Sequence, residues 1–442
     1  MRLSRFTIFI DEFPGTGTHL AFNTRTQAQV VIDQRLRDVL EDLAGNEYDS
    51  DTTTALTRLQ NMGLVVADGE DEDRTIEAWF AEIAQDKSVM RATVLTTYDC
   101  NFACPYCVEQ GVKAPVYMSR ETAAGVVDDI KARTEKNRPR RLLLNFYGGE
   151  PLMNLVAIRI VAGGLKDYCE KAAIDYSAGM STNGALLTAK VVDELCRYGV
   201  RSVKVTLDGM RDVHNRSRPF RNGKGSFDTI IENVRSAIDK VSVDVGGNFD
   251  EHNIDSLVEL LEYLRDLGLA SKIRRVRFKP ISKTFKDREA KVTNADLGCV
   301  YFEQAVMQNM LRLRKAILER GFTTDPGVGM NLCGIMMNES FYTIDPLGKL
   351  YQCEALVGRE QFSVGDIASD RGEFQPLNLW RRCIGCEYVP LCGDGCIHAA
   401  LVRFGDHTKL NCDKAFMAFM VKETLKLNYE YAHKKVENSP RL

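Results

Sequence analysis

The sequence contains no run of about 18 uncharged apolar residues, the length that a helix needs to cross a membrane. Its N-terminus lacks the features of a secretory signal peptide, because the apolar stretch is short, Asp11 and Glu12 follow it, and no small-residue cleavage site is present. The net charge is only −3, so no overall field attracts nucleic acid. We therefore expect a cytoplasmic protein that binds neither a membrane nor nucleic acid.

The overall composition is that of a folded protein, with 44% hydrophobic and 27% charged residues among 442. This length predicts roughly two to four domains. The unusual feature is the count of 13 cysteines. Nothing indicates export, and in a reducing compartment clustered cysteines are more often metal ligands than disulfides. Three scattered ones are interpreted as small buried hydrophobes: Cys169, Cys196 and Cys299.

Residues 1–90 contain no cysteine and form the first predicted unit. FTIFI, HLAFNT and AQVVID are typical of short strands. Helical patterns follow at RLRDVLEDLAG, which ends at Gly45, at SDTTTALTRLQNMGLV and at TIEAWFAEIAQ. The acidic run DGEDEDR is interpreted as a solvated loop. Strands followed by helices indicate a winged-helix-like module.

Residues 91–290 alternate between strand and helix patterns. Six such units predict parallel strands, in a barrel or an open partial barrel whose chemistry lies at the carboxyl ends of the strands. The predicted strands are MRATVLTT, RLLLNFYG, IDYSAGMSTN, SVKVTLDG, VSVDVGGN and RRVRFKPI. A helical bridge over residues 291–330 leads to a cysteine-dense unit, 331–442, which ends in a polar helix.

Cys100, Cys104 and Cys107 follow the first barrel strand with the spacing Cys-x3-Cys-x2-Cys. A four-iron cluster needs four ligands, which are usually thiolates. Three neighbouring cysteines leave one iron open to an external ligand. The alternatives are a zinc site completed elsewhere and thiols without a metal.

This loop, with Tyr106 before its third cysteine, resembles the signature of the radical S-adenosylmethionine (SAM) superfamily. The resemblance implies that a [4Fe-4S] cluster binds SAM through its amino and carboxylate groups. One electron then releases a 5′-deoxyadenosyl radical, which abstracts hydrogen from a substrate. It also implies that Tyr106 lies near the adenine and that a flavodoxin or ferredoxin-type protein supplies the electron.

Further motifs follow in the order that this family has. Gly148 and Gly149 permit a close backbone approach, and Glu150 can accept a hydrogen bond from the SAM ammonium group, although a strand-end turn is the alternative. The segment from Ser181 to Asn183 is similar to the one whose polar side chains contact the SAM carboxylate and ribose.

Asp208, followed by His214 and Arg218, is similar to the peptide- and sulfatase-modifying branch of the family. We count Asp208 among the cofactor-binding residues. Arg218 is a candidate catalytic residue that can bind a carboxylate bidentately, and a solvated surface arginine is the alternative. Asn248 is expected to contact the ribose or adenine.

The cysteine-dense unit resembles a SPASM domain, which carries two auxiliary [4Fe-4S] clusters, so three clusters are expected in all. The alternative is a zinc ribbon-like knob. The resemblance assigns auxiliary cluster I to Cys333, Cys353 and Cys396. It assigns auxiliary cluster II to Cys383, Cys386, Cys392 and Cys412.

Auxiliary cluster I lacks one cysteine that sulfatase-maturing relatives have, because DPGVGMNL stands in its place. Asp325, Cys299 or a substrate thiolate could complete it. Glu354 stands where those relatives place an acidic base, and we expect it to take a proton from the substrate. The alternative for Glu354 is a salt-bridged acid.

The leading hypothesis is a maturase of ribosomally made peptides. Such an enzyme binds a precursor peptide through residues 1–90 and installs a thioether or carbon–carbon crosslink. The second hypothesis is oxidation of a Cys or Ser side chain to formylglycine. The third is a non-catalytic iron–sulfur electron-transfer scaffold, for which a SAM pocket would have no use.

Overall fold

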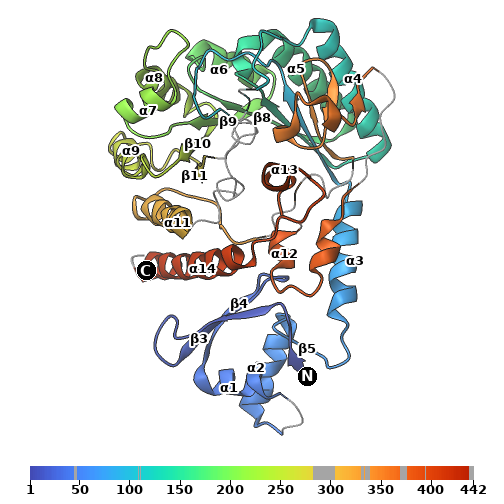
Figure 1. The fold of residues 1–442 in the computed structure, drawn as a ribbon, viewed down its shortest axis with the longest axis vertical. Helices are drawn as coiled ribbons and strands as arrows, with labels where there is room; N and C mark the ends of the chain where they lie inside the picture. The colour runs from blue at the N-terminus through green and yellow to red at the C-terminus, as the bar shows by residue number, and fades with distance from the viewer. Residues whose placement is uncertain are drawn as a thin grey trace.

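The computed structural model describes residues 1–43, 47–107, 109, 111–281, 304–329, 333, 339–368, 376–393 and 395–437. Figure 1 shows the N-terminal unit at one end of the molecule and the large α/β sheet at the other, with C-terminal helices between them. No helix in these ranges is long and apolar enough to span a membrane.

The six predicted strands are confirmed, and all pair in parallel in the order of the chain. They are β6 (Val89–Leu95), β7 (Arg141–Tyr147), β8 (Asp175–Thr182), β9 (Val200–Thr206), β10 (Ser242–Phe249) and β11 (Arg275–Pro280). The helical elements between them are α4 (Arg120–Asn137), η1 (Pro151–Asn154), α5 (Leu155–Ala172), α6 (Ala189–Arg197), α7 (Arg211–Ser217), α8 (Phe227–Ala237) and α9 (Ile254–Asp266).

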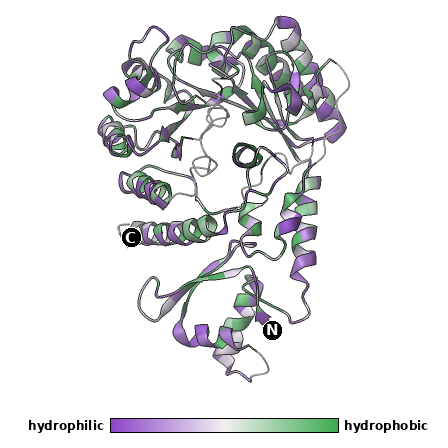
Figure 2. Ribbon diagram, viewed as in Figure 1, coloured by the Kyte–Doolittle hydropathy of each residue, from purple (hydrophilic) through white to green (hydrophobic). Residues whose placement is uncertain are grey.

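The two faces of this sheet differ in polarity. Along β9, Val203 and Val205 are fully buried in the main core, whereas Lys204 and Thr206 point to the other face and stay partly accessible. A parallel sheet that is covered by helices on both faces would be apolar on both. The alternation therefore means that one face packs on helices while the other lines a polar interior. Figure 2 shows hydrophobic and hydrophilic segments alternating along the covering helices.

The sheet continues into the cysteine-dense unit. β12 (Phe341–Ile344) pairs in parallel with β6, and β13 (Lys349–Tyr351) and β14 (Gly365–Asp366) extend it antiparallel. The order β11-β10-β9-β8-β7-β6-β12-β13-β14 makes an open sheet, as expected for a partial barrel. The sequence did not predict that strands from both sides of residue 331 share one sheet.

The N-terminal unit has the three predicted strands, β2 (Thr7–Ile10), β3 (Thr18–Asn23) and β4 (Gln29–Asp33). They form an antiparallel sheet in the order β2-β3-β4. One face packs on the N-terminal helices, and the other packs on C-terminal side chains that include Val421 and Leu425. The remaining elements are β1 (Arg2–Leu3), α1 (Gln34–Glu41), α2 (Ser50–Asn61), β5 (Val65–Val66) and α3 (Glu72–Gln85). The predicted helix end at Gly45 lies outside the described residues, and the winged-helix assignment stays a prediction.

The acidic run 68–74 is only partly a solvated loop, so that interpretation was wrong in its second half. Helix α3 begins inside it, and Asp71 caps the helix by accepting bonds from the N–H groups of Asp73 (3.1 Å) and Arg74 (3.0 Å). Glu72 is buried and accepts a 2.6 Å bond from Ser4. Acidic residues are favoured at a helix N-terminus because its N–H groups and dipole stabilise negative charge.

The C-terminal part is mainly helical. Its elements are α11 (Gln304–Glu319), η4 (Glu354–Leu356), η5 (Glu360–Phe362), η6 (Leu379–Cys383), α12 (Val389–Cys392), α13 (Ile397–Phe404) and α14 (Lys414–Glu437). Helix α11 confirms the described portion of the predicted bridge, and α14 confirms the polar C-terminal helix. In Figure 1, α14 lies between the N-terminal sheet and the α/β sheet.

Candidate functional site

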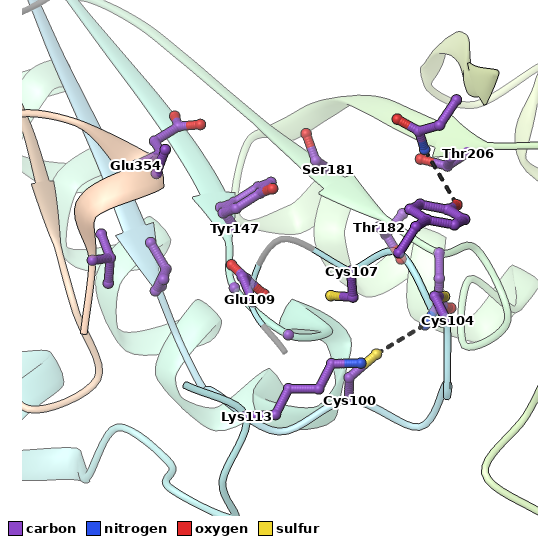
Figure 3. A pocket seen from close by; sticks show the side chains of 18 of the residues that line it. Cys100, Cys104, Cys107, Glu109, Lys113, Tyr147, Ser181, Thr182, Thr206 and Glu354 are labelled. Carbon is purple, nitrogen blue, oxygen red and sulfur yellow. Dashed lines mark hydrogen bonds between the residues drawn. The ribbon is translucent and has the colours of Figure 1, made fainter. Parts of the chain in front are cut away.

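A cavity of about 480 Å³ lies at the carboxyl ends of the parallel strands, within the range of small-ligand pockets. Helix α13 and the η4 turn contribute His398 and Glu354 to its wall. Figure 3 shows the three loop cysteines on one side of this cavity and Glu354 on another. Of the residues predicted from the sequence, the lining includes Cys100, Cys104, Tyr106, Cys107, Gly148, Gly149, Ser181, Asn183, Arg218, Asn248 and Glu354.

The first three cysteines lie together at the cavity. Cys100 and Cys104 are buried, and Cys107 is half-buried. The Cys100 sulfur accepts bonds from the backbone N–H of Phe102 (3.4 Å) and from Nδ2 of Asn183 (3.9 Å). Burial raises the pKa of Cys100 to about 11, so the thiolate needs positive charge nearby, such as that of bound iron. N–H donors aimed at a thiolate are typical of iron–sulfur sites, and this donor set fits a cluster.

Two neighbouring segments hold the cysteine loop in place. The Asp99 carboxylate accepts a 2.9 Å bond from the N–H of Cys100 and further bonds from Tyr117 and Arg221. The N–H of Arg221 donates to Asn101 O at 3.0 Å. These bonds fix the backbone from which the cysteine side chains project.

The predicted close approach at Gly148 and Gly149 is made to the cysteine loop itself. A Cβ atom on Gly149 would lie 2.5 Å from the carbonyl carbon of Asp99 and 2.8 Å from Tyr98 O. Gly148 has a φ of +124°, which disfavours any side chain. The N–H of Gly149 donates to Thr97 O at 3.1 Å. Strand β7 therefore ends directly against the loop, and only glycine allows this contact.

Glu150 does not line the cavity. It is fully buried, and its carboxylate accepts bonds from the N–H groups of Leu152 (3.0 Å) and Asn183 (2.7 Å) and from the Thr182 hydroxyl (2.7 Å). The predicted contact with the SAM ammonium group stays untested. The structure gives Glu150 a supporting role, because it ties the end of β7 to the end of β8.

Asn183 connects this support to the cysteine loop. Its Nδ2 donates a 2.7 Å bond to Asn101, and its Oδ1 accepts a 2.9 Å bond from the N–H of Ala185. Ser181 and Asn183 both line the cavity, as predicted. Their polar atoms lie where a ligand beside the cysteines can reach them.

Tyr106, Asp208, Arg218 and Asn248 form one hydrogen-bonded network. The Tyr106 hydroxyl donates to Asp208 and accepts from Arg218 Nη1 (2.7 Å) and Asn248 Nδ2 (3.3 Å). Asp208 is fully buried beneath the cavity and also accepts from the N–H of Asn248 at 2.8 Å. Asp208 therefore orients the residues of the cavity wall, and the lining does not include it.

Arg218 is not the solvated surface arginine that was the alternative. Its side chain is 12% exposed and lies 3.9 Å from the Asp208 carboxylate. Its Nε atom is buried and has no hydrogen-bond partner among the described residues. Arg218 lines the cavity, and its guanidinium group fits an anionic or carbonyl ligand there.

His214 supports the same network. Its Nδ1 accepts a 3.2 Å bond from the N–H of Asp208, and its Nε2 lies 3.1 Å from Ser226 Oγ. Ser226 in turn donates to Arg218 O at 2.7 Å. Burial and the nearby Arg218 charge lower the His214 pKa to about 3, so the imidazole is neutral.

The structure assigns no role in the cavity to the remaining predicted residues. Glu354 is exposed at the cavity and accepts a 2.9 Å bond from Thr93, which leaves its role as a base untested. Asp325 forms ion pairs with Arg275 and Arg277. Cys299 lies outside the described residues. Cys169 is fully buried, as expected, and Cys196 is half-buried.

Some of the C-terminal cysteines are neighbours of one another. The Cys353 thiol has Cys333 and Cys396 as electrostatic neighbours. Its pKa is raised to about 12, mainly by burial and to a smaller extent by these two neighbours. Cys386 has Cys412 as a neighbour, and its N–H donates to Cys383 O at 2.9 Å. Within the described ranges, no three His, Cys, Asp or Glu side chains converge on a single metal ion. Cluster ligation here stays a prediction.

Sequence reasoning missed six charged residues of the cavity wall: Glu109, Lys113, Lys204, Arg277, Lys279 and Arg359. For the three that lie on strands, the signal was present in the alternation of side chains. In SVKVTLDG, Lys204 occupies the same face as Asp208, and in RRVRFKPI, Arg277 and Lys279 share one face. These inward-facing positions could have been identified once the strands were assigned.

Residues 94–271 match the model of the Radical SAM superfamily. This segment holds the end of β6, the cysteine loop, the four strands from β7 to β10 and the network above, so it is a radical SAM domain. The protein is accordingly an enzyme that uses SAM. The family implies a [4Fe-4S] cluster, which together with SAM supplies a 5′-deoxyadenosyl radical, and the donor set around Cys100, Cys104 and Cys107 fits it.

Curated relatives are distant in sequence. A Fe-coproporphyrin III synthase of Methanosarcina barkeri is 27% identical over 236 residues, which cover 52% of this chain and 52% of that protein. The radical SAM cyclopropyl synthase TigE of Paramaledivibacter caminithermalis is 22% identical over 392 residues. That match covers 78% of this chain and 76% of TigE. The shared length thus ranges from about half to three quarters of these relatives.

Solved structures share the fold at low sequence identity. Native anSMEcpe with bound AdoMet and the Cp18Cys peptide superposes with a TM-score of 0.58 at 17% identity, covering 79% of this chain and 98% of that one. SuiB of Streptococcus suis bound to its precursor peptide SuiA has a TM-score of 0.51 at 14% identity. That match covers 93% of this chain and 99% of SuiB.

Proposed function

We propose that this enzyme is a peptide maturase. It abstracts hydrogen from a residue of a ribosomally made precursor peptide and installs a thioether or carbon–carbon crosslink. The observation that carries the proposal is the match to SuiB, which was solved with a precursor peptide and shares the fold over 93% of this chain. Coverage of that extent has to include part of residues 1–90, the unit that we assign to peptide binding.

The described residues suit this chemistry. Cys100, Cys104 and Cys107 hold the cluster, and Ser181 and Asn183 orient the polar end of SAM beside it. Tyr106, held by Asp208, forms the wall for the adenosyl group. The guanidinium group of Arg218, which lines the cavity, holds a carboxylate or carbonyl group at the same site.

We further propose that the C-terminal unit is a SPASM domain with two auxiliary clusters. The neighbouring Cys333, Cys353 and Cys396 suit the first, and the group that contains Cys386 and Cys412 suits the second. A cluster near the cavity can accept the electron that remains when a substrate radical closes a new bond. Flavodoxin or ferredoxin is the proposed source of the electron for SAM cleavage.

The N-terminal sheet is proposed as the docking site for the leader peptide, in a winged-helix-like module. Both of its faces are covered, so a peptide has to join an edge. In the described chain, β2 and β4 are the two edge strands. An added strand would gain main-chain hydrogen bonds at either edge.

Oxidation of a Cys or Ser side chain to formylglycine is the second candidate. It is favoured by the fold shared with anSMEcpe, which was solved with AdoMet and the Cp18Cys peptide. Glu354, which lines the cavity, would serve as the base in that reaction. The scaffold hypothesis is set aside, because the protein is an enzyme.

Co-expression with the short peptide encoded beside the gene tests the proposal. We expect the peptide to lose the mass of two hydrogen atoms, and fragmentation to locate a link between two residues. The Cys104→Ala variant is the control and should leave the peptide unmodified. A modification confined to one Cys or Ser residue would support the second candidate instead. An unmodified peptide with the active enzyme would contradict both.

A further inference from the structure

Three cationic side chains line the cavity on the strands next to the Tyr106 network. They are Lys204 on β9, and Arg277 and Lys279 on β11. In the sheet register, Gly246 of β10 pairs with Arg277, and Asn248 pairs with Lys279. Because side chains alternate along a strand, all three cations belong to the interior face, as does Asn248.

Strand β10, which lies between β9 and β11, has a glycine, Gly246, at the position that pairs with Arg277. A Cβ atom on Gly246 would lie 2.7 Å from Cε of Lys204, so a side chain here would displace that lysine. Strands two apart in a sheet are about 10 Å from each other. Because Gly246 has no side chain, the Lys204 side chain can lie across β10 toward Arg277, the residue that pairs with Gly246.

These cations have few carboxylate partners among the described residues. The side chains of Lys204 and Lys279 form no hydrogen bond or ion pair with a described residue, and Glu354 is the carboxylate that interacts electrostatically with both. Arg277 lies 3.5 Å from Asp325, but Asp325 also pairs with Arg275, so one carboxylate serves two guanidinium groups. Burial and the neighbouring cations lower the pKa of Lys204 and of Lys279. The fold therefore holds like charges together with a surplus of positive charge.

The wall of the whole cavity is basic. Its cationic residues are Lys113, Lys204, Arg218, Arg277, Lys279 and Arg359, and its carboxylates are Glu109 and Glu354. A surplus of positive charge raises the local concentration of oppositely charged ligands. At neutral pH the anionic groups of an unmodified peptide are its carboxylates.

We propose that Lys204, Arg277 and Lys279 form a substrate subsite that binds a carboxylate of the peptide, from an acidic residue close in sequence to the one that is modified. The inference rests on the proposed function, because it takes the substrate to be a peptide. The subsite orients the peptide across β10, so that one chosen residue faces the SAM side of the cavity. It therefore selects which residue reacts.

The first test measures binding of two labelled pentapeptides, Gly-Glu-Gly-Glu-Gly and its Gln counterpart, to the full-length, cluster-loaded protein with SAM. The protein should prefer the Glu peptide about tenfold, as expected for a hydrogen-bonded charge. The double variant Arg277→Gln/Lys279→Gln should lose this preference.

The matched control is Lys240→Gln/Lys272→Gln, which removes the same charge. Lys240 already pairs with Asp193 (2.5 Å) and Lys272 with Asp239 (2.8 Å), so the preference should remain. Equal binding of the two peptides by the unmodified protein overturns the inference, as does an equal loss in the control. Loss of SAM affinity in the double variant, with both peptides bound alike, also overturns it, because the bound carboxylate would then be that of SAM.

The second test separates this inference from the proposed function. In the peptide encoded beside the gene, each acidic residue is changed to its amide. One such change should raise KM about tenfold for the unmodified enzyme and have little effect on the double variant. If the peptide is modified without this coupling, the subsite fails and the maturase stands. If no peptide is modified but the Glu preference depends on Arg277 and Lys279, the maturase fails and the subsite stands.

Discussion

Replacing Gly149 with alanine should disable the cysteine loop while leaving the cysteines in place. The added methyl group would lie 2.5 Å from the carbonyl carbon of Asp99 and 2.8 Å from Tyr98 O, both far inside van der Waals contact. Both atoms are backbone, so no side chain can rotate away. The end of β7 must therefore move away from the loop.

The magnitude follows from two contributions. Overpacking in a filled interior costs about 1–3 kcal/mol. The shift also lengthens the bonds from Gly149 N to Thr97 O (3.1 Å) and from Glu150 N to Asp99 O (2.8 Å), each worth about 1 kcal/mol. We expect a destabilisation of about 3–5 kcal/mol, a large share of the 5–15 kcal/mol that holds a typical domain together.

The assay counts iron per chain after anaerobic reconstitution and follows 5′-deoxyadenosine release. Gly149→Ala should lose as much iron as Cys104→Ala and release almost no 5′-deoxyadenosine. Gly69→Ala is the matched control, because a Cβ atom there meets nothing within 4 Å. A Gly149→Ala protein with full iron content and deoxyadenosine release within twofold of the unmodified enzyme would refute the reasoning.

Three further perturbations test other parts of the site. Tyr98→Phe removes the 2.7 Å bond to the buried Asp345 and should lower the free energy of unfolding by about 1–3 kcal/mol in urea titrations. The control Tyr48→Phe removes only a solvent-exposed 3.2 Å bond to Asp42 O and should lower it by less. The His214 pKa of about 3 lies below its value of about 6.5 in the unfolded chain, so His214 adds to the free energy of unfolding above pH ~6.5. This stabilisation is lost as the pH falls toward 3. His214→Asn should therefore flatten the fall of unfolding free energy between pH 7.5 and 5, and an unchanged slope would contradict this. Arg218→Lys keeps the charge but loses the planar donor set, so KM for SAM or peptide should rise about tenfold with little change in iron content; equal kinetics would exclude a binding role.

The strands and the cysteine loop could be predicted because their signals are local. The alternation of apolar and polar residues along β9 and the helical period of α9 can be recognised from neighbouring residues alone. The spacing of Cys100, Cys104 and Cys107 is likewise a property of one short loop. The polar ends of the strands could likewise be placed at one edge of the sheet. These features needed no knowledge of distant contacts.

What could not be predicted depends on contacts between distant segments. The parallel pairing of β12 with β6 joins residues about 250 positions apart, and no local pattern specifies it. The sequence likewise could not show that Glu150 and Asp208 are buried below the cavity, because a carboxylate beside a glycine turn has the same sequence whether it faces a ligand or the protein. Burial, and not residue type, decided their roles.

The central claim is that the loop of Cys100, Cys104 and Cys107 carries a cluster that cleaves SAM. The most direct measurement is anaerobic release of 5′-deoxyadenosine from SAM with dithionite, for the reconstituted protein and for a variant with all three cysteines changed to alanine. We predict release by the first and none by the second, with iron lost from the variant. Equal release by both proteins, or zinc in place of iron in the active preparation, would contradict the account.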